Sequence, residues 1–242
     1  MGWRIALYLA ALATAAVTAL GIWLIRDDPA FSAETVEPQA VASRVAWRGL
    51  FRNRNLLLLA AGYFTINYFE YIFFYWIYYY FGQIRGMSVQ SSAVYTTVLS
   101  LSMMAGTPLG GWLCDRLTLV TGAAKSRQAV AGGGMVLSAV CLYAGTMMTS
   151  TIPMVAMLSL AIGLAAAAEG PFWSAAIETG GSNVGVSCGI MNGVGNVGGL
   201  LAPVLTPWIA QMAGWSVSLH FASALILFGA STWLLNRPRA AE

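Results

Sequence analysis

Seven runs of apolar residues, each close to or above the length that crosses a lipid bilayer, dominate this sequence. A helix needs about 20 mostly apolar residues to span the hydrocarbon core. The composition agrees, because only 9% of the 242 residues are charged, whereas soluble domains hold about 25%. We therefore expect an all-α, polytopic protein of the lipid bilayer with seven transmembrane helices. The predicted spans are residues 5–25, 56–81, 93–113, 130–148, 154–176, 188–210 and 219–235.

The same composition excludes several classes of protein. A surface so poor in charge does not suit a soluble enzyme or a nucleic-acid binder. Cys114, Cys141 and Cys188 lie in or beside apolar runs without paired spacing, and His220 is the single histidine. Neither a metal site nor a cofactor is expected from these residues.

Basic residues predict the orientation in the membrane. With the N-terminus outside, only Arg4 and Arg85 lie on the outer side. Cytoplasmic loops carry an excess of Lys and Arg, so this asymmetry places the C-terminus in the cytoplasm and the chain in the cell membrane. The residues predicted on the inner side are Arg26, Arg44, Arg48, Arg52, Arg54, Arg116, Lys125, Arg127, Arg237 and Arg239.

Glu70 lies near the middle of the predicted span 56–81, among aromatic residues. A carboxyl group within a bilayer is costly to ionise and tends to face the bundle interior or a water-filled cavity. Asn67, Tyr71, Phe74 and Tyr78 are assigned to its helical face, and all five are candidates for a substrate cavity. The alternative is an aromatic helix whose glutamate hydrogen-bonds a neighbour and has a structural role only.

Glu169 is the second carboxyl well inside a predicted span, and Pro171 follows two residues later. Proline removes a backbone donor and disturbs the helical turn. The freed carbonyl groups are tolerated where they are buried or line a cavity. Glu169 and Ser174 are therefore further cavity candidates, and a structural kink is the alternative.

The span 188–210 is rich in glycine and asparagine. Gly185, Gly189 and Gly193 form one ridge of small residues, and Gly195 with Gly199 forms another. Such ridges let helices approach closely. Asn192 and Asn196 lie four residues apart on one face, where they could bind substrate or hydrogen-bond another helix. Residues 193–198 also match a dinucleotide-binding pattern, which we reject because no strand precedes it.

Spans two to four and five to seven can be compared as two triplets of opposite topology. The middle span of each triplet holds a glycine–proline cluster, at residues 106–111 and 198–203. Paired interrupted segments at corresponding positions point to the binding site of a transporter. Breaks are therefore expected near both clusters.

Three segments resemble the C-terminal half of the major facilitator superfamily. The superfamily's motif between helices eight and nine is similar to Gly111-Trp112-Leu113-Cys114-Asp115-Arg116, which Lys125 and Arg127 follow. Within the superfamily, the anion:cation symporter family has a helix seven that resembles residues 75–81 with 85–88. Its helix eleven resembles residues 189–199 with Pro203.

The resemblance implies a secondary transporter that carries a small organic anion, such as a sugar acid, by symport with protons. Residues 1–25 would correspond to helix six, 26–55 to the central cytoplasmic loop, and 56–242 to the C-terminal six-helix bundle. Gly111, Asp115 and Arg116 would form a cytoplasmic gating motif. The partner would be a missing N-terminal half or a second copy, so we expect no coupled transport by this chain alone.

Other functions remain to be compared with transport. A membrane enzyme needs a nucleophile–base pair, for which the sequence offers no support. A retinal protein needs a lysine within the membrane, and the one lysine, Lys125, lies in a predicted loop. A seven-helix receptor, or a structural membrane protein without transport activity, stays the alternative.

Overall fold

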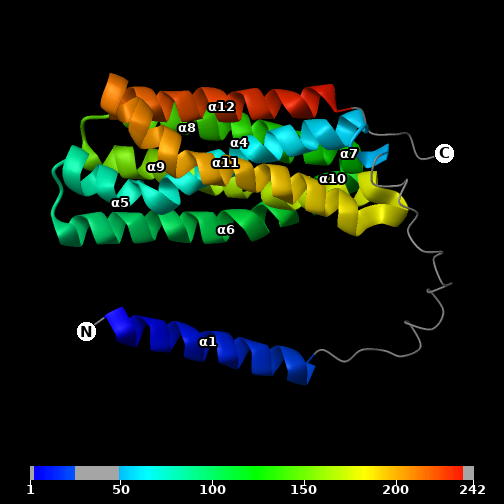
Figure 1. Ribbon diagram of the computed structural model, residues 1–242, viewed down its shortest axis with the longest axis horizontal. Coiled ribbons are helices and arrows are strands. Elements are labelled where there is room, and N and C mark those ends of the chain that lie inside the picture. The colour runs from blue at the N-terminus through cyan, green and yellow to red at the C-terminus, as the bar shows by residue number, and fades with distance from the viewer. Residues whose placement is uncertain (1–2, 25–48, 237–242) are drawn as a thin grey trace. The chain divides into compact units, whose positions relative to one another are not determined.

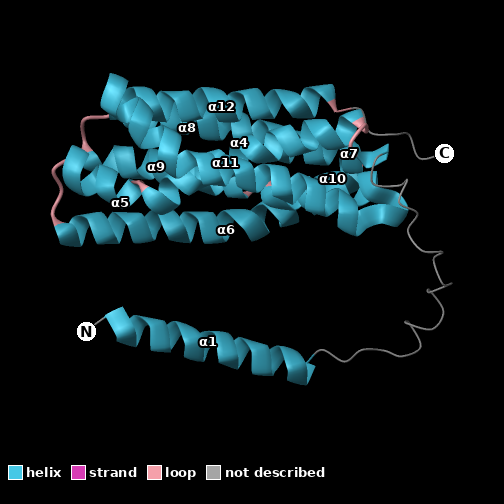
Figure 2. Ribbon diagram, viewed as in Figure 1, coloured by secondary structure: helices cyan, strands magenta, loops and turns pink. Residues whose placement is uncertain are grey.

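A computed structural model describes residues 3–24 and 49–236, and all of the regular structure in these residues is helical (Figure 2). The chain divides into two compact units, residues 1–43 and 44–242. The described part of the first unit is the single helix α1 (Trp3–Leu24). Arg26, Arg44, Arg48, Arg237 and Arg239, with most of the predicted loop 26–55, lie outside the described residues.

The described part of the second unit holds six successive helical segments joined by short connections. All six predicted spans of this unit fall within them, as the first span, except Ile25, falls within α1. Along the chain the elements are α4 (Arg54–Tyr75), α5 (Ile77–Tyr79), the π-helix η1 (Tyr80–Ile84), α6 (Val89–Thr121), α7 (Ala123–Arg127), the π-helix η2 (Gln128–Gly132), α8 (Gly133–Met147), α9 (Thr151–Ala166), α10 (Glu169–Gly180), the 3-10 helix η3 (Gly181–Asn183), α11 (Val184–Ala213) and α12 (Trp215–Leu235).

Five helical stretches of the described chain are long and apolar enough to cross a membrane. One of them, Thr151–Ala213, is 63 residues long, which is enough for the two crossings that α9–α10 and α11 provide. Helix α6 does not belong to these five, although it has 33 residues, because serine, threonine and glycine interrupt its apolar sequence. The predicted all-α fold is confirmed for the described residues.

Helix α4 packs against α11, α12 and α10, and α9 packs against α6 and α8 (Figure 1). Glycine makes two of these crossings close. A Cβ atom on Gly198 would collide with the carbonyl oxygen of Phe64, and one on Gly106 would collide with that of Gly163. Helices α4 and α11, and likewise α6 and α9, therefore approach backbone to backbone.

Successive segments run in alternating directions, so the connections gather at two ends of the bundle (Figure 1). We call one of them the basic end, because its described residues include five cations: Arg52, Arg54, Arg116, Lys125 and Arg127. At the opposite end, Arg85 caps α8. Its Nη2 donates to the carbonyl oxygens of Met148, at 2.7 Å, and Thr149, at 3.1 Å.

The helix interruptions differ in part from the predicted ones. A break separates α9 from α10 just before Glu169, as expected near Pro171. The breaks expected near the two glycine–proline clusters are wrong, because α6 continues through Pro108 and α11 through Pro203 and Pro207. A proline removes one backbone hydrogen bond from a helix. The helix can continue through it where its packing against neighbouring helices is otherwise favourable.

Candidate functional site

Two donors from different helices hold the carboxyl group of Glu169. The Tyr63 hydroxyl of α4 donates to its Oε2 at 2.9 Å, and the Trp173 Nε1–H of α10 donates to the same atom at 3.2 Å. Glu169 is half-buried, in the first turn of α10. The two hydrogen bonds fix the position of the Glu169 carboxyl group between α4 and α10.

Glu70 has the opposite environment. Its side chain is only 5% exposed, and its Oε1 has no hydrogen-bond partner among the described residues. Glu70 lies seven residues after Tyr63 on α4, about two helical turns away and on the same side of the helix as the donor to Glu169. The structure therefore brings together the two intramembrane acids, one held by donors and one buried without them.

Tyr63 lies where α4, α10 and α11 meet. Its ring centroid is 5.5 Å from that of Phe172 and 6.0 Å from that of Trp173. On the α11 side, a Cβ atom on Gly195 would collide with the Tyr63 ring. The absence of a side chain at Gly195 is thus what lets the tyrosine reach Glu169.

The remaining candidates on α4 and α5 do not share one environment. Asn67 is buried and donates to the carbonyl oxygen of Tyr63 at 2.9 Å, whereas Phe74 and Tyr78 are 58% and 45% exposed. Tyr71 follows Glu70 directly, which places it about 100° around the helix, with its ring against Gly199. The prediction of one shared face is wrong, since α4 also ends at Tyr75 and a π-helix follows α5.

The polar candidates on α10 and α11 are exposed on the bundle. Asn196 Nδ2 donates to Asn192 Oδ1 at 3.1 Å and to the Asn192 carbonyl at 2.9 Å. Ser174 is exposed as well. The ridge of Gly185, Gly189 and Gly193 has open space around it within the described residues. Of the two predicted ridges, only Gly195 with Gly199 makes a close approach, and Gly198 between them does so too.

The predicted gating motif lies near the basic end of α6. Asp115 and Arg116 are exposed, and the Arg116 guanidinium lies 5.8 Å from the centre of the Trp112 ring. Gly111 is half-buried, and its Cα would touch a Cβ atom on Gly170 of α10. The glycine thus lies at the contact between α6 and α10, next to Glu169.

Sequence reasoning missed Tyr63 and Trp173 as the donors to Glu169. Trp173 could have been found, because it lies four residues after Glu169 on the same helix and therefore on the same face. Tyr63 is 106 residues away in sequence, and no local pattern indicates that pairing.

Six successive helical segments of alternating direction, with glycines at their crossings, are an architecture found in polytopic membrane proteins. The family model described as "Major Facilitator Superfamily" matches residues 1–125, just over half of the chain. The chain belongs to the Major Facilitator Superfamily and is a multi-pass membrane protein.

Three curated relatives are named as transporters of organic anions. The chain is 25% identical over 202 residues to the probable sulfoacetate transporter of Cupriavidus necator, covering 83% of this chain and 46% of that protein. It is 25% identical to the hexuronate transporter of Bacillus subtilis, with coverages of 85% and 47%, and to the D-galactonate transporter of Escherichia coli, with 78% and 44%. The chain spans about half the length of the curated relatives it matches.

Proposed function

We propose that this chain forms one wall of a secondary transporter for a small organic anion, with sugar acids as the leading substrate class, and that protons drive uptake by symport. In this proposal residues 56–242 are the C-terminal bundle and α1 corresponds to helix six. A second six-helix bundle supplies the opposite wall. The names of the relatives support the substrate class.

The observation that carries the proposal is the acid pair at the junction of α4, α10 and α11. Tyr63, which holds Glu169, and the buried Glu70 lie about two turns apart on α4, and the neighbouring α11 exposes Asn192 and Asn196. Intramembrane acids mark ion and proton pathways. The exposed asparagines supply donors and acceptors for the hydroxyl groups of a sugar acid.

The charges on this wall indicate that the two walls have different roles in binding the substrate and the proton. The described spans contain the carboxyl groups of Glu70 and Glu169 deep within them, while the described cations lie at or near the helix ends. An anionic substrate is repelled by a carboxylate, and a proton on that carboxylate removes the repulsion. This wall therefore handles the proton and the substrate hydroxyls, and the opposite wall supplies the cation for the anionic group.

Glu70 is the residue we assign to the proton. It is buried without a hydrogen-bond donor to its Oε1 among the described residues, and a neutral carboxylic acid is the form that tolerates such a site. Besides Glu169, the described ionisable side chains on the helices packed against α4 are Glu178, Cys188 and His220, together with Tyr78 and Tyr79 of α5.

The basic end is assigned to the cytoplasm by the excess of Lys and Arg there. The N-terminus is then outside, the chain crosses the cell membrane, and Gly111, Asp115 and Arg116 lie on the cytoplasmic side as a gating motif. Rocking of the two walls about the central site then opens it to each side in turn.

The test is uptake by proteoliposomes. The protein is purified in a mild detergent from its native membrane, so that a second bundle stays attached, and is reconstituted with an inward proton gradient. Labelled sulfoacetate, hexuronate and D-galactonate are the probes. We expect saturable, gradient-dependent uptake of at least one of them. Uptake equal to that of protein-free liposomes for every probe would overturn the proposal.

A further inference from the structure

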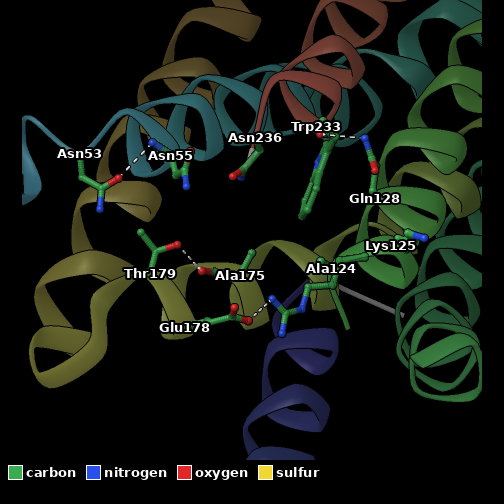
Figure 3. Close-up of a pocket in the computed structure, with 11 residues that line it drawn as sticks. Asn53, Asn55, Ala124, Lys125, Gln128, Ala175, Glu178, Thr179, Trp233 and Asn236 are labelled. Carbon is green, nitrogen blue, oxygen red and sulfur yellow. Dashed lines mark hydrogen bonds and ion pairs between the residues drawn. The ribbon is translucent and has the colours of Figure 1, made fainter. Parts of the chain in front are cut away.

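A pocket of about 170 Å³ opens among helix ends of the second unit, away from the two intramembrane acids (Figure 3). Its walls come from the start of α4, from α7 with η2, from the second half of α10, and from the end of α12. A single water needs only about 10–15 Å³ of such space. The pocket therefore has room for a ligand with several non-hydrogen atoms.

The charges around this pocket leave one cation without a counter-ion. Arg127 and Glu178 form an ion pair across it, drawn as a dashed line in Figure 3, and neutralise each other. Lys125 also lines the pocket, and within the described part of the chain no carboxylate pairs with its ammonium group. The described lining thus carries a net charge of +1.

Amide and indole groups of the lining supply further donors. Asn53 uses its Oδ1 to accept from the backbone N–H groups of Asn55 and Leu56, which leaves its Nδ2 to donate. Gln128 gives one N–H to the Trp233 carbonyl at 3.1 Å and keeps a second. The Trp233 ring extends into the pocket in Figure 3, and its buried Nε1–H has no acceptor among the described residues.

We infer that this pocket is a binding site for a phosphate-type oxyanion. Lysine binds phosphate as a point charge, and a tetrahedral oxyanion accepts hydrogen bonds from several sides, as the donors of α4, η2 and α7 provide. This site is separate from the transport path and does not depend on the proposed transport function. The phosphate can come from water, as inorganic phosphate or a phosphate monoester, or from the headgroup of a membrane lipid, because the pocket lies at the helix ends.

The experiment measures the thermal unfolding midpoint of the full chain in an uncharged detergent. One arm adds inorganic phosphate, with sodium chloride adjusted to hold the ionic strength constant. The other adds a short-chain phosphatidylglycerol, with an uncharged diacylglycerol of the same chain length as its control. A ligand that binds the folded state raises the midpoint in a concentration-dependent manner, and we expect a rise of several degrees in at least one arm.

Two variants assign that rise to the pocket. Lys125→Gln removes the unpaired cation from an exposed side chain and is expected to weaken the affinity by about tenfold, since a hydrogen bond to a charged group is lost. Asn53→Asp keeps the helix cap, because aspartate caps as well as asparagine, and places a negative charge at the pocket, so it should weaken binding too. Arg52→Gln removes one exposed cation of the basic end that does not line the pocket, and it should respond as the wild type does.

The outcomes distinguish a soluble phosphate from a lipid headgroup and show whether the pocket binds an oxyanion at all. A response to inorganic phosphate that Lys125→Gln weakens identifies a soluble ligand, and a response to the phospholipid alone identifies a headgroup site. Either supports the inference. It is overturned if the wild type responds to neither probe, or if Lys125→Gln and Asn53→Asp respond as strongly as Arg52→Gln.

Discussion

The Tyr63 hydroxyl of α4 donates a 2.9 Å hydrogen bond to Oε2 of Glu169 in α10. This bond joins residues 106 positions apart in sequence, on two different helices, and fixes the second of the two intramembrane acids. The contact depends on Gly195 of α11, where any side chain would meet the Tyr63 ring. Three helices thus cooperate to hold one carboxyl group.

Removing this hydroxyl should destabilise the bundle. Tyr63→Phe keeps the ring contacts with Phe172 and Trp173 and deletes one donor to a carboxylate, which costs about 1.5–3 kcal/mol. We expect a lower thermal unfolding midpoint in detergent. Tyr75→Phe is the matched control, because Tyr75 is exposed on the same helix, and its midpoint should not change. Equal midpoints for both variants would contradict a structural role for the Tyr63–Glu169 bond.

Glu70→Gln should separate proton coupling from folding. The amide has the shape of a protonated carboxyl group, so the unfolding midpoint should stay within the error of the wild type. Uptake driven by the inward proton gradient should be lost, while exchange of substrate across the membrane without a gradient should persist in part. Both rates are measured on the same proteoliposomes. If gradient-driven uptake keeps its pH dependence, Glu70 does not carry the proton.

Two glycines of α11 should respond in opposite ways to substitution by alanine, because only one of them lies at a helix crossing. Gly198→Ala places a methyl group against the Phe64 carbonyl and should cost about 1–3 kcal/mol through overpacking. Gly193→Ala, in the same helix with open space around it, should be neutral or stabilising, since alanine favours a helix by about 1 kcal/mol over glycine. Thermal unfolding of both variants tests this difference. A larger loss for Gly193→Ala would show that the α4–α11 crossing is misplaced.

These two glycines also show how far the sequence predicts the structure. Helix positions could be predicted because membrane spans need long apolar runs, and each of the seven expected spans overlaps described helices over nearly its whole length. Which glycines lie at a helix crossing could not be predicted, because spacing alone does not show which ridge faces a neighbouring helix. The ridge at Gly185, Gly189 and Gly193 and the glycines at 195, 198 and 199 are equally good patterns, and only the second set packs against α4.

The two acids of the candidate site could be predicted from the sequence, but their surroundings could not. Glu70 and Glu169 could be selected because carboxyl groups are rare within membrane spans. Their different surroundings depend on Tyr63 and on an unpartnered Oε1, which are tertiary features. The shared face assigned to Tyr71 was wrong because successive residues of a helix lie about 100° apart, and the one assigned to Tyr78 was wrong because α4 ends at Tyr75 and a π-helix follows α5.

The proposed orientation predicts which helix ends meet the cytoplasm. In a background with alanine at the three native cysteines, a cysteine at Gln90 should react with a membrane-impermeant maleimide added to intact cells. A cysteine at Thr121 should react only after the cells are permeabilised. Both positions are exposed, at the first and last turns of α6. The reverse pattern would place the basic end outside.

The most direct test of the transport path is substrate protection of a cysteine at position 196 in the same cysteine-free background. Asn196 is exposed on α11 beside Asn192, where the account places a water-filled path for an organic anion. A cysteine at Phe228, which is 62% exposed on α12, serves as the lipid-facing control. We expect that Asn196→Cys reacts readily with the impermeant maleimide in proteoliposomes and that a transported organic anion slows this reaction. Phe228→Cys should stay unreactive. Equal low reactivity at both positions, or labelling at 196 that no transported anion slows, would contradict it.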